Sequence, residues 1–275
     1  LIGSPMIALT RPLNCFIAAF CVLSGAYIVE SVLWHPPVIL AMVSIWCLCA
    51  GANVLNDVCD VQIDRHNKSD RPLASGRVSE RAAVGLAIAM YILGAGLSIL
   101  LSPHHVLISG IIIVLTVLYN ITLKRRLLIG NLVAAGAASL AFVYGGMLGP
   151  DVYYILIPTG FAFLFHFGRE ILKDMEDIPG DRAGHVVSAP IRFGVSSARL
   201  IITVTFLSLM VTTIWPYAAG WFGMRYLALV SLVDLILVYV LWSVWRDTSP
   251  DNAGRLSRIL KANMVIGVMA VVLGR

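Results

Sequence analysis

The chain has 275 residues, of which 59% are hydrophobic and only 13% are charged. A soluble domain carries about 25% charged residues, so this composition excludes a soluble enzyme and indicates a polytopic membrane protein. The net charge of +5 suits anionic lipid headgroups on one side of a bilayer, and we expect no nucleic-acid partner.

Hydropathy predicts an all-α fold with nine membrane-spanning helices, which we expect to surround a central cavity. Each apolar segment is close to the ~20 residues that an α-helix needs to cross the hydrocarbon core. We expect a single transmembrane domain over residues 1–275. The first segment lacks a basic stretch before it and is long enough to span, so we interpret it as a helix and not as a cleavable signal. The expected spans are 13–33, 37–57, 80–101, 104–121, 128–149, 152–176, 197–219, 222–246 and 257–274.

The lysines and arginines orient these spans. With nine spans, eighteen of the twenty fall on one side of the membrane, and only Arg225 and Arg275 fall on the other. The positive-inside rule assigns the crowded side to the cytoplasm. We therefore predict a multi-pass protein of the cell (plasma) membrane, whose cavity and active-site loops open to the cytoplasm.

The cysteines indicate neither a disulfide framework nor a zinc site. All five lie in the first 60 residues, mostly inside expected spans, and no pair of histidines accompanies them at zinc-ligand spacing. An odd number also argues against paired bridges. We interpret them as small buried apolar residues.

The first expected span opens with Thr10-Arg11-Pro12-Leu13-Asn14. Pro12 suits the first turn of a helix, where its missing N–H costs nothing. Two interpretations of Arg11 stay open: an anchor at the membrane interface, or a cation of a functional site. Asn14 lies one turn deeper and is a second candidate for that site.

The stretch from Asn53 to Arg77 is dense in charge. Its carboxylates include Asp57, Asp60 and Asp64. Their i, i+3, i+7 spacing places them on one face of a helix at ~100° per residue. Carboxylates on one face repel one another unless a cation lies among them. The pattern therefore predicts a divalent metal site beside basic groups that bind an anion, most simply a phosphate. The other candidate contacts here are Asn53, Asn56, Lys68 and Arg71.

Three adjacent cations, Lys124, Arg125 and Arg126, follow the fourth expected span. Either they only set the topology, or they bind a phosphate, because their loop is on the same side as the aspartates. Tyr119, Asn120 and Asn131 add polar groups at a similar depth.

Glycine and alanine are frequent in the fifth expected span, 128–149. Small residues let helices approach one another closely, so we predict close packing here and not a nucleotide-binding loop.

Asp174, Asp177 and Asp181 repeat the i, i+3, i+7 pattern at the end of the sixth expected span. Pro179-Gly180 is expected to end the helix, which would put Asp181 on a loop. One such run alone is commonly a solvated helix end. Two runs on the same side, each flanked by Lys or Arg, predict the two halves of one site, and Lys173 joins the candidates for phosphate contact.

The other titratable groups receive no role in the site. His66 and His185 lie in the same loops without a partner for metal binding, and His166 is interpreted as hydrogen-bonded within its span. Asp234 lies deep in a span, where a charge costs about 2.5–3.5 kcal/mol, so we expect a polar partner or a wet cavity beside it.

The two runs, Asn56-Asp57-Val58-Cys59-Asp60-Val61-Gln62-Ile63-Asp64 and Asp174-Met175-Glu176-Asp177-Ile178-Pro179-Gly180-Asp181, resemble the paired motifs of the UbiA-type intramembrane prenyltransferase superfamily. The resemblance covers nearly the whole chain. Three segments, at 11–15, 119–131 and 169–181, look most like archaeal-type digeranylgeranylglyceryl phosphate synthases. The loop 184–191 departs from the Thr-Leu-Pro-Ile run that is common in such relatives.

The resemblance implies nine helices, a prenyl diphosphate substrate, Mg²⁺ as cofactor and a membrane-embedded acceptor lipid. The acceptor implied is the free hydroxyl of geranylgeranylglyceryl phosphate, with Arg11 or a residue of the loop after 121 near its phosphate. No obligate protein partner is expected. The expected metal ligands are Asn56, Asp57, Asp60, Asp174 and Asp177. Asp64 and Asp181 would complete the cluster or orient the loop cations. The expected phosphate contacts are Lys68, Arg71, Lys124, Arg125 and Lys173, and Tyr119 and Asn120 would steady the cation or position the acceptor.

Two other functions stay open. An aromatic-acceptor prenyltransferase of quinone or pigment synthesis would need the same aspartates, since acceptor choice depends on the shape of the pocket. A divalent-cation transporter also uses intramembrane carboxylates, but its site should lie near the bilayer midplane. A CDP-alcohol phosphotransferase is disfavoured, because its Asp-x-x-Asp-Gly-x-x-Ala-Arg run is absent.

Overall fold

The computed structural model describes residues 4–30, 35–150, 152–183 and 187–274, and every regular element within them is a helix. The elements in order are α1 (Pro5–Leu9), α2 (Pro12–Glu30), α3 (Pro36–Asn67), α4 (Glu80–Ile99), α5 (Pro103–Ile121), η1 (Leu123–Arg125), α6 (Ile129–Gly146), η2 (Val152–Ile155), α7 (Leu156–Glu176), α8 (Ile178–Ala183), α9 (Ala189–Phe193), α10 (Val195–Ala218), α11 (Met224–Arg246) and α12 (Pro250–Leu273).

Nine helices of the described segments are long and apolar enough to cross a membrane: α2 to α7 and α10 to α12. This number confirms the expected count. Two boundaries were wrong. α3 was expected to end at 57 but continues to Asn67, so all three aspartates of the first run lie on the helix. α12 was expected from 257 but begins at Pro250, where the Ser249 side chain accepts a hydrogen bond from the backbone N–H of Asn252 and caps the helix.

The expectation that Pro179-Gly180 leaves Asp181 on a loop was also wrong. α7 ends at Glu176, and a new short helix, α8, begins at Ile178 and contains Asp181. Proline is tolerated in the first turn of a helix, where its nitrogen has no hydrogen bond to lose. Pro179 therefore starts the next turn of helix instead of opening a loop.

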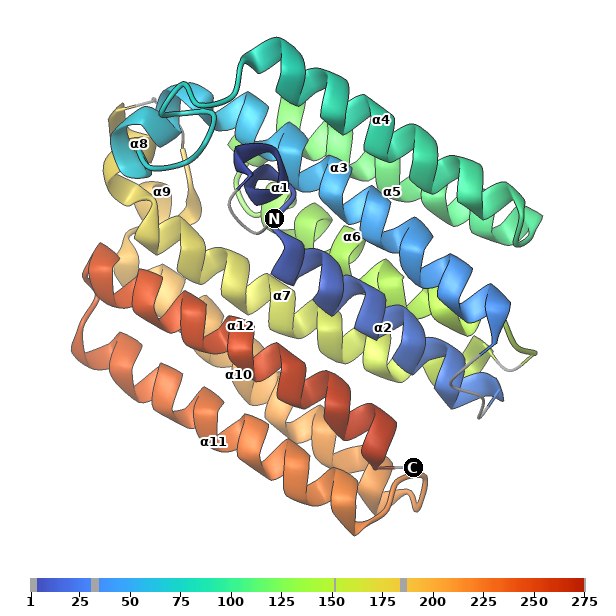
Figure 1. The fold of residues 1–275 in the computed structure, drawn as a ribbon. Helices are drawn as coiled ribbons and strands as arrows, with labels where there is room; N and C mark the ends of the chain where they lie inside the picture. The colour runs from blue at the N-terminus through green and yellow to red at the C-terminus, as the bar shows by residue number, and fades with distance from the viewer. Residues whose placement is uncertain (1–3, 31–34, 151, 184–186, 275) are drawn as a thin grey trace.

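The long helices run alongside one another as a bundle (Figure 1), with two large apolar cores and smaller apolar clusters beside them. One core is formed largely by α2, α3, α5 and α6, and the other by α7, α10, α11 and α12. α12 packs against both α2 and α7, which joins the two halves. The short helices α8 and α9 lie at one end of the bundle, beside the C-terminal ends of α3 and α7 (Figure 1).

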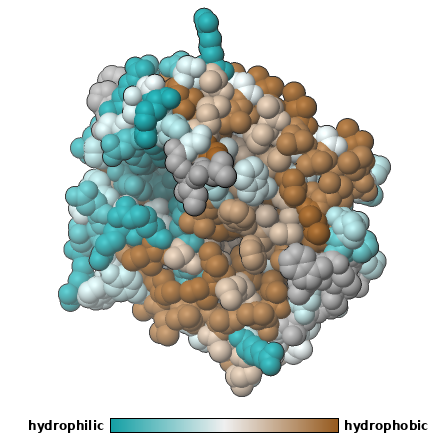
Figure 2. Space-filling view, in the orientation of Figure 1, coloured by the Kyte–Doolittle hydropathy of each residue, from teal (hydrophilic) through white to brown (hydrophobic). Residues whose placement is uncertain are grey.

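The outer surface of the bundle is apolar, as a lipid environment requires. Side chains such as Ile99 and Val211 are 70% and 72% exposed, which would be costly in water at about 25 cal/mol per Å². In Figure 2 hydrophobic residues cover much of the visible face, and hydrophilic ones gather toward the end where α8 and α9 lie. The chain is therefore a multi-pass membrane protein, and its charged end is the end that carries both aspartate runs.

Candidate active site

α3 carries the first aspartate run on a face turned into the protein. Asp57, Asp60 and Asp64 are 3%, 7% and 5% exposed. The helix stays regular through them because no proline or glycine occurs between residues 52 and 67. A buried carboxylate is costly unless a cation or a hydrogen-bond donor meets it. Other segments of the chain must therefore supply those partners.

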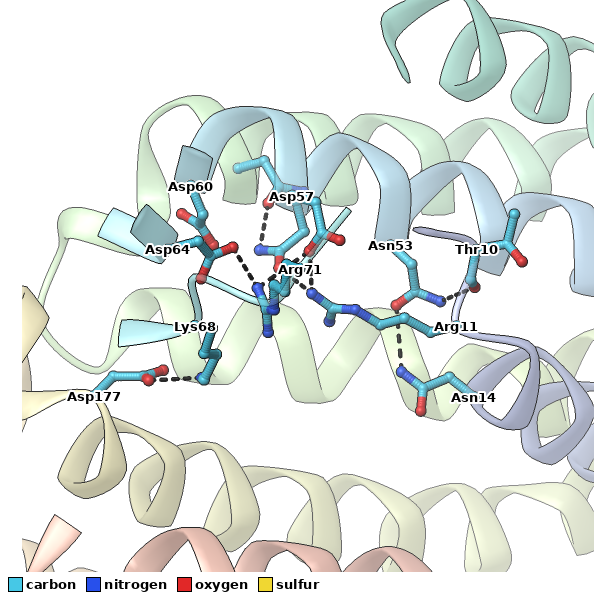
Figure 3. A network of polar contacts seen from close by, with 12 residues as sticks. Thr10, Arg11, Asn14, Asn53, Asp57, Asp60, Asp64, Lys68, Arg71 and Asp177 are labelled. Carbon is cyan, nitrogen blue, oxygen red and sulfur yellow. Dashed lines mark hydrogen bonds and ion pairs between the residues drawn. The ribbon is translucent and has the colours of Figure 1, made fainter. Parts of the chain in front are cut away.

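Cations from two separate segments reach this face of α3. Arg11, just before α2, donates to Asp57 and, at 3.2 Å, to the amide oxygen of Asn56 (Figure 3). Lys124, in η1, donates to Asp60. The Asn56 amide nitrogen in turn donates to the Asn120 side-chain oxygen at 3.0 Å. The expected site residues of α3, α5 and η1 thus meet in one network.

The loop after α3 folds back and returns Arg71 to the same helix. The Arg71 guanidinium lies 3.2 Å from a carboxylate oxygen of Asp57 and also pairs with Asp64 (Figure 3). The Ser75 hydroxyl donates to the Arg71 carbonyl at 2.8 Å, and Leu73 packs into an apolar cluster with Val61. The loop is therefore held in a shape that keeps Arg71 between two carboxylates.

The second run lies opposite, at the junction of α7 and α8. Asp174 accepts a hydrogen bond from the Asn131 amide nitrogen at 3.0 Å. Asp177 pairs with Lys68, whose Nζ lies 2.7 Å from a carboxylate oxygen (Figure 3). Burial raises the pKa of the Asp181 carboxyl to about 6, and repulsion from Asp177 acts in the same direction. A nearby positive charge such as that of Lys124 acts in the opposite direction and favours the ionised carboxylate.

Both runs line one cavity of about 60 Å³ at the charged end of the bundle. Among its lining residues, six carboxylates face five cationic side chains, so its wall carries a slight excess of negative charge. Asp57 does not line it, because it is buried and paired with Arg11 and Arg71. The charged lining residues are Arg11, Asp60, Asp64, Lys68, Arg71, Lys124, Glu170, Lys173, Asp174, Asp177 and Asp181.

A larger cavity of about 260 Å³ continues from the first into the bundle. The residues that line both are Arg11, Asn56, Tyr119, Glu170 and Lys173. A third cavity of about 80 Å³, lined mostly by apolar side chains, follows. It shares Cys21, His166 and Met264 with the larger cavity. The three cavities make a path from a charged end to an apolar interior, which suits a molecule with an anionic head and a hydrocarbon tail.

Comparison with known proteins assigns the chain to a family. The model of the UbiA prenyltransferase family matches residues 18–265. The chain belongs to this family. The prediction of a prenyltransferase enzyme, made from the paired aspartate runs, is confirmed.

Two of the most similar relatives of this UbiA-family prenyltransferase are described as digeranylgeranylglyceryl phosphate synthases. The protein of Methanopyrus kandleri is 35% identical and covers 95% of this chain and 96% of its own length. A solved structure described as digeranylgeranylglyceryl phosphate synthase in membranes is 29% identical, with a TM-score of 0.77 over 98% of this chain and 97% of the other. A UbiA homologue from Archaeoglobus fulgidus, bound to GPP and Mg²⁺, shares the fold with a TM-score of 0.73 at 17% identity over 98% of this chain and 100% of the other.

The donor set of this UbiA-family chain fits a hard divalent cation in its chemistry. Carboxylate and amide oxygens from α3 and from α7–α8 surround one cavity, and Mg²⁺ prefers such ligands. Within the described ranges, no three acidic, His or Cys side chains are grouped closely enough to hold an ion. The reason is visible in the contacts: Lys68, Arg71 and Lys124 engage the carboxylates. A diphosphate would attract these cations and free carboxylate oxygens for the metal.

Most of the expected site residues are brought together, but they line two connected cavities. Asn14 and Asn53 line the larger cavity and lie 3.4 Å apart through their amide groups, away from the aspartates. The side chains of Arg125 and His66, and all of His185, lie outside the described residues. The metal and phosphate roles of the individual residues stay predictions.

Three charged residues that line the larger cavity had no predicted role in the site: Arg169, Glu170 and Lys261. Glu170 accepts from Lys173 at 3.0 Å and lies 3.7 Å from Arg169. Lys261 had been counted only among the eighteen cations on one side of the membrane; it lies within α12 and lines the cavity. The sequence held one signal for it: Ser249-Pro250 is a helix start, and Lys261 follows three turns later.

Proposed function

We propose that the chain is a Mg²⁺-dependent prenyltransferase that transfers a geranylgeranyl group from its diphosphate to the free hydroxyl of geranylgeranylglyceryl phosphate. One observation carries the proposal: both aspartate runs and their basic partners line a cavity that continues into an apolar interior. The relatives described as digeranylgeranylglyceryl phosphate synthases, of which one is 35% identical, support the choice of acceptor. We further propose that residues 1–275 act as one transmembrane domain, without an obligate protein partner.

The charged cavity would bind the diphosphate. A prenyl diphosphate carries about three negative charges, and Lys68, Arg71 and Lys124 are the cations that can turn toward it. Asn56, Asp60, Asp174 and Asp177 would hold Mg²⁺, which supplies positive charge against the diphosphate oxygens as the allylic C–O bond breaks. Asp57 and Asp64 would keep Arg11 and Arg71 in position.

The deeper cavities would bind the isoprenoid chain. Each buried CH₂ contributes roughly 0.8 kcal/mol, so an apolar path gives a long chain much of its affinity. The same walls exclude water, which would otherwise capture the allylic cation. Tyr119 lines both the charged and the larger cavity, so its ring lies where the reacting carbon would pass. The acceptor oxygen then forms the new C–O bond, and its proton is taken up by the released diphosphate.

The aspartates provide the first test. Asp60→Asn and Asp177→Asn should each abolish Mg²⁺-dependent release of diphosphate from geranylgeranyl diphosphate in nanodiscs, because the loss of one stabilising group costs about 10²–10³-fold in kcat. EDTA should abolish the wild-type reaction. Asp251→Asn is the control, because this exposed carboxylate begins α12, outside the cavities. Retained activity in either site variant would contradict the proposal that both aspartate runs hold Mg²⁺.

The acceptor needs a separate test, since an aromatic acceptor would use the same aspartates. Membranes with labelled geranylgeranyl diphosphate should label geranylgeranylglyceryl phosphate and not 4-hydroxybenzoate or a related phenol. Preferential labelling of a phenol would reassign the acceptor while leaving the prenyltransferase intact. We propose that the reaction occurs at the plasma membrane with the aspartate end in the cytoplasm, where the positive charge gathers.

A further inference from the structure

The larger cavity differs from the aspartate cavity in the sign of its charge. Four cationic side chains line it, and Glu170 is its one carboxylate among the described lining residues. The aspartate cavity has slightly more carboxylates than cations. The wall of the larger cavity therefore favours an anion, and the wall of the aspartate cavity favours a metal ion. The four cations are Arg11, Arg169, Lys173 and Lys261.

Lys261 is the cation that the aspartate site does not explain. It lies eleven residues after Pro250 in α12, or about 17 Å along the helix at 1.5 Å per residue. Arg11, Arg169 and Lys173 each have a carboxylate within ion-pair distance. No carboxylate of the described residues forms an ion pair with Lys261. A charged side chain within an apolar, membrane-spanning helix is costly and marks a functional site by default.

We propose that Lys261, together with Arg11 and Arg169, forms a second anion site that binds the phosphate monoester of the acceptor lipid. The inference rests on the proposed function. Asn14 and Asn53 add amide groups to the same wall, and Ile17, Ala134 and Ala138 add apolar surface for an alkyl chain. A phosphate held there is set apart from the diphosphate held by the aspartates.

The second anion site would make Lys261 a specificity-determining residue. An acceptor with a phosphate satisfies the unpaired ammonium group of Lys261, whereas an acceptor that lacks it leaves this half-buried cation without a partner. Discrimination of this kind is large because a charged group of the site stays unpaired with the wrong substrate. The chain would then reject uncharged acceptors through α12 and not through the aspartates.

The test compares Lys261→Gln, Lys261→Arg and the wild type in nanodiscs. The readout is kcat/KM for geranylgeranylglyceryl phosphate relative to its dephosphorylated alcohol. Lys261→Gln should lower this ratio about 10- to 100-fold, as expected for a lost hydrogen bond to a charged group, and Lys261→Arg should restore most of it. Arg258→Gln is the matched control, because this exposed cation lies one turn earlier on α12 and lines none of the cavities.

Other outcomes would overturn the inference. An unchanged ratio would show that Lys261 does not bind the acceptor phosphate. A rise in KM for geranylgeranyl diphosphate alone would assign Lys261 to the diphosphate. A second measurement needs no variant: the wild type without prenyl donor should bind the phosphorylated lipid more tightly than the alcohol. Equal binding of the two lipids overturns the site. Displacement of both lipids to the same extent by inorganic phosphate or glycerol phosphate also overturns it. Diphosphate release by the wild type, measured in parallel, tests the proposed function separately.

Discussion

At the scale of single residues, Lys68 joins the two halves of the site. It follows α3 directly, yet its ammonium group pairs with Asp177 at the end of α7, 109 positions away in the sequence. Glu176 lies 3.9 Å from the same group. A cation between the runs screens their mutual repulsion when no metal is bound, and it can contact a diphosphate that enters between them.

We predict that Lys68→Ala lowers kcat/KM for geranylgeranyl diphosphate by about 10- to 150-fold, since a hydrogen bond to a charged group contributes about 1.5–3 kcal/mol. Lys68→Arg should retain most of the activity. Arg65→Ala is the control, because Arg65 lies one turn earlier, is exposed, and donates to Gln62. Steady-state kinetics in nanodiscs measure all three variants. Equal losses for Lys68→Ala and Arg65→Ala would show that only general charge matters.

The residues of the site could be predicted from spacing, but their pairings could not. The i, i+3, i+7 pattern put Asp57, Asp60 and Asp64 on one face of α3, which the structure confirms. Which cation meets which carboxylate depends on chain segments far apart, as in the contact between Lys124 and Asp60. Spacing also could not separate Asp57, buried behind its cations, from Asp60, which faces the cavity.

At the scale of helices, composition predicted the spans and local chemistry shifted their ends. Pro179-Gly180 was interpreted as the end of a helix, yet Pro179 lies in the first turn of α8. Lys261 was counted only among the cations that orient the spans, yet it lines an internal cavity from α12. A cation near the end of an apolar segment has the same sequence signature whether it faces water, headgroups or an internal cavity. Only the packing of α12 against α2 and α7 distinguishes these cases.

The glycines of α6 give a test of helix packing. A Cβ at Gly145 would overlap the backbone carbonyl of Val22 in α2, whereas a Cβ at Gly136 would meet open space. We predict that Gly145→Ala destabilises the protein by about 1–3 kcal/mol through overpacking. Gly136→Ala should be neutral or slightly stabilising, because alanine favours a helix by up to about 1 kcal/mol. The measurement is the temperature at which each variant loses monodispersity in detergent.

Equal melting of the two variants would contradict this packing of α2 against α6. The contrast also refines the sequence prediction, in which all the glycines of the span served close packing. Gly145 does so, and Gly25 on α2 approaches α6 in the same way, through the Phe142 carbonyl. Gly136 does not. Composition alone cannot tell which glycine of a span lies at the contact, because that depends on the rotation of each helix.

At the scale of the whole molecule, the bundle separates charge along its axis. The aspartate end holds both acidic runs, most of the cations and the charged cavity, and the flanks are apolar. The nine spans found among the described residues put the start of α2 and the end of α12 on opposite sides. The positive-inside rule predicts that the aspartate end is cytoplasmic, and we expect water-soluble diphosphate to leave there.

The two ends of α10 test this orientation. Ser196→Cys lies at its aspartate end and Ala219→Cys just beyond its other end, and both positions are exposed. Cys49 and Cys59 are replaced by alanine, because the other three cysteines are buried. A membrane-impermeant maleimide on intact cells should label Ala219→Cys, and Ser196→Cys only after permeabilisation. The reverse pattern would place the aspartates outside the cell, contrary to the positive-inside rule. Labelling of both in intact cells would mean that α10 does not span, because one helix cannot cross the bilayer and leave both ends on the same side.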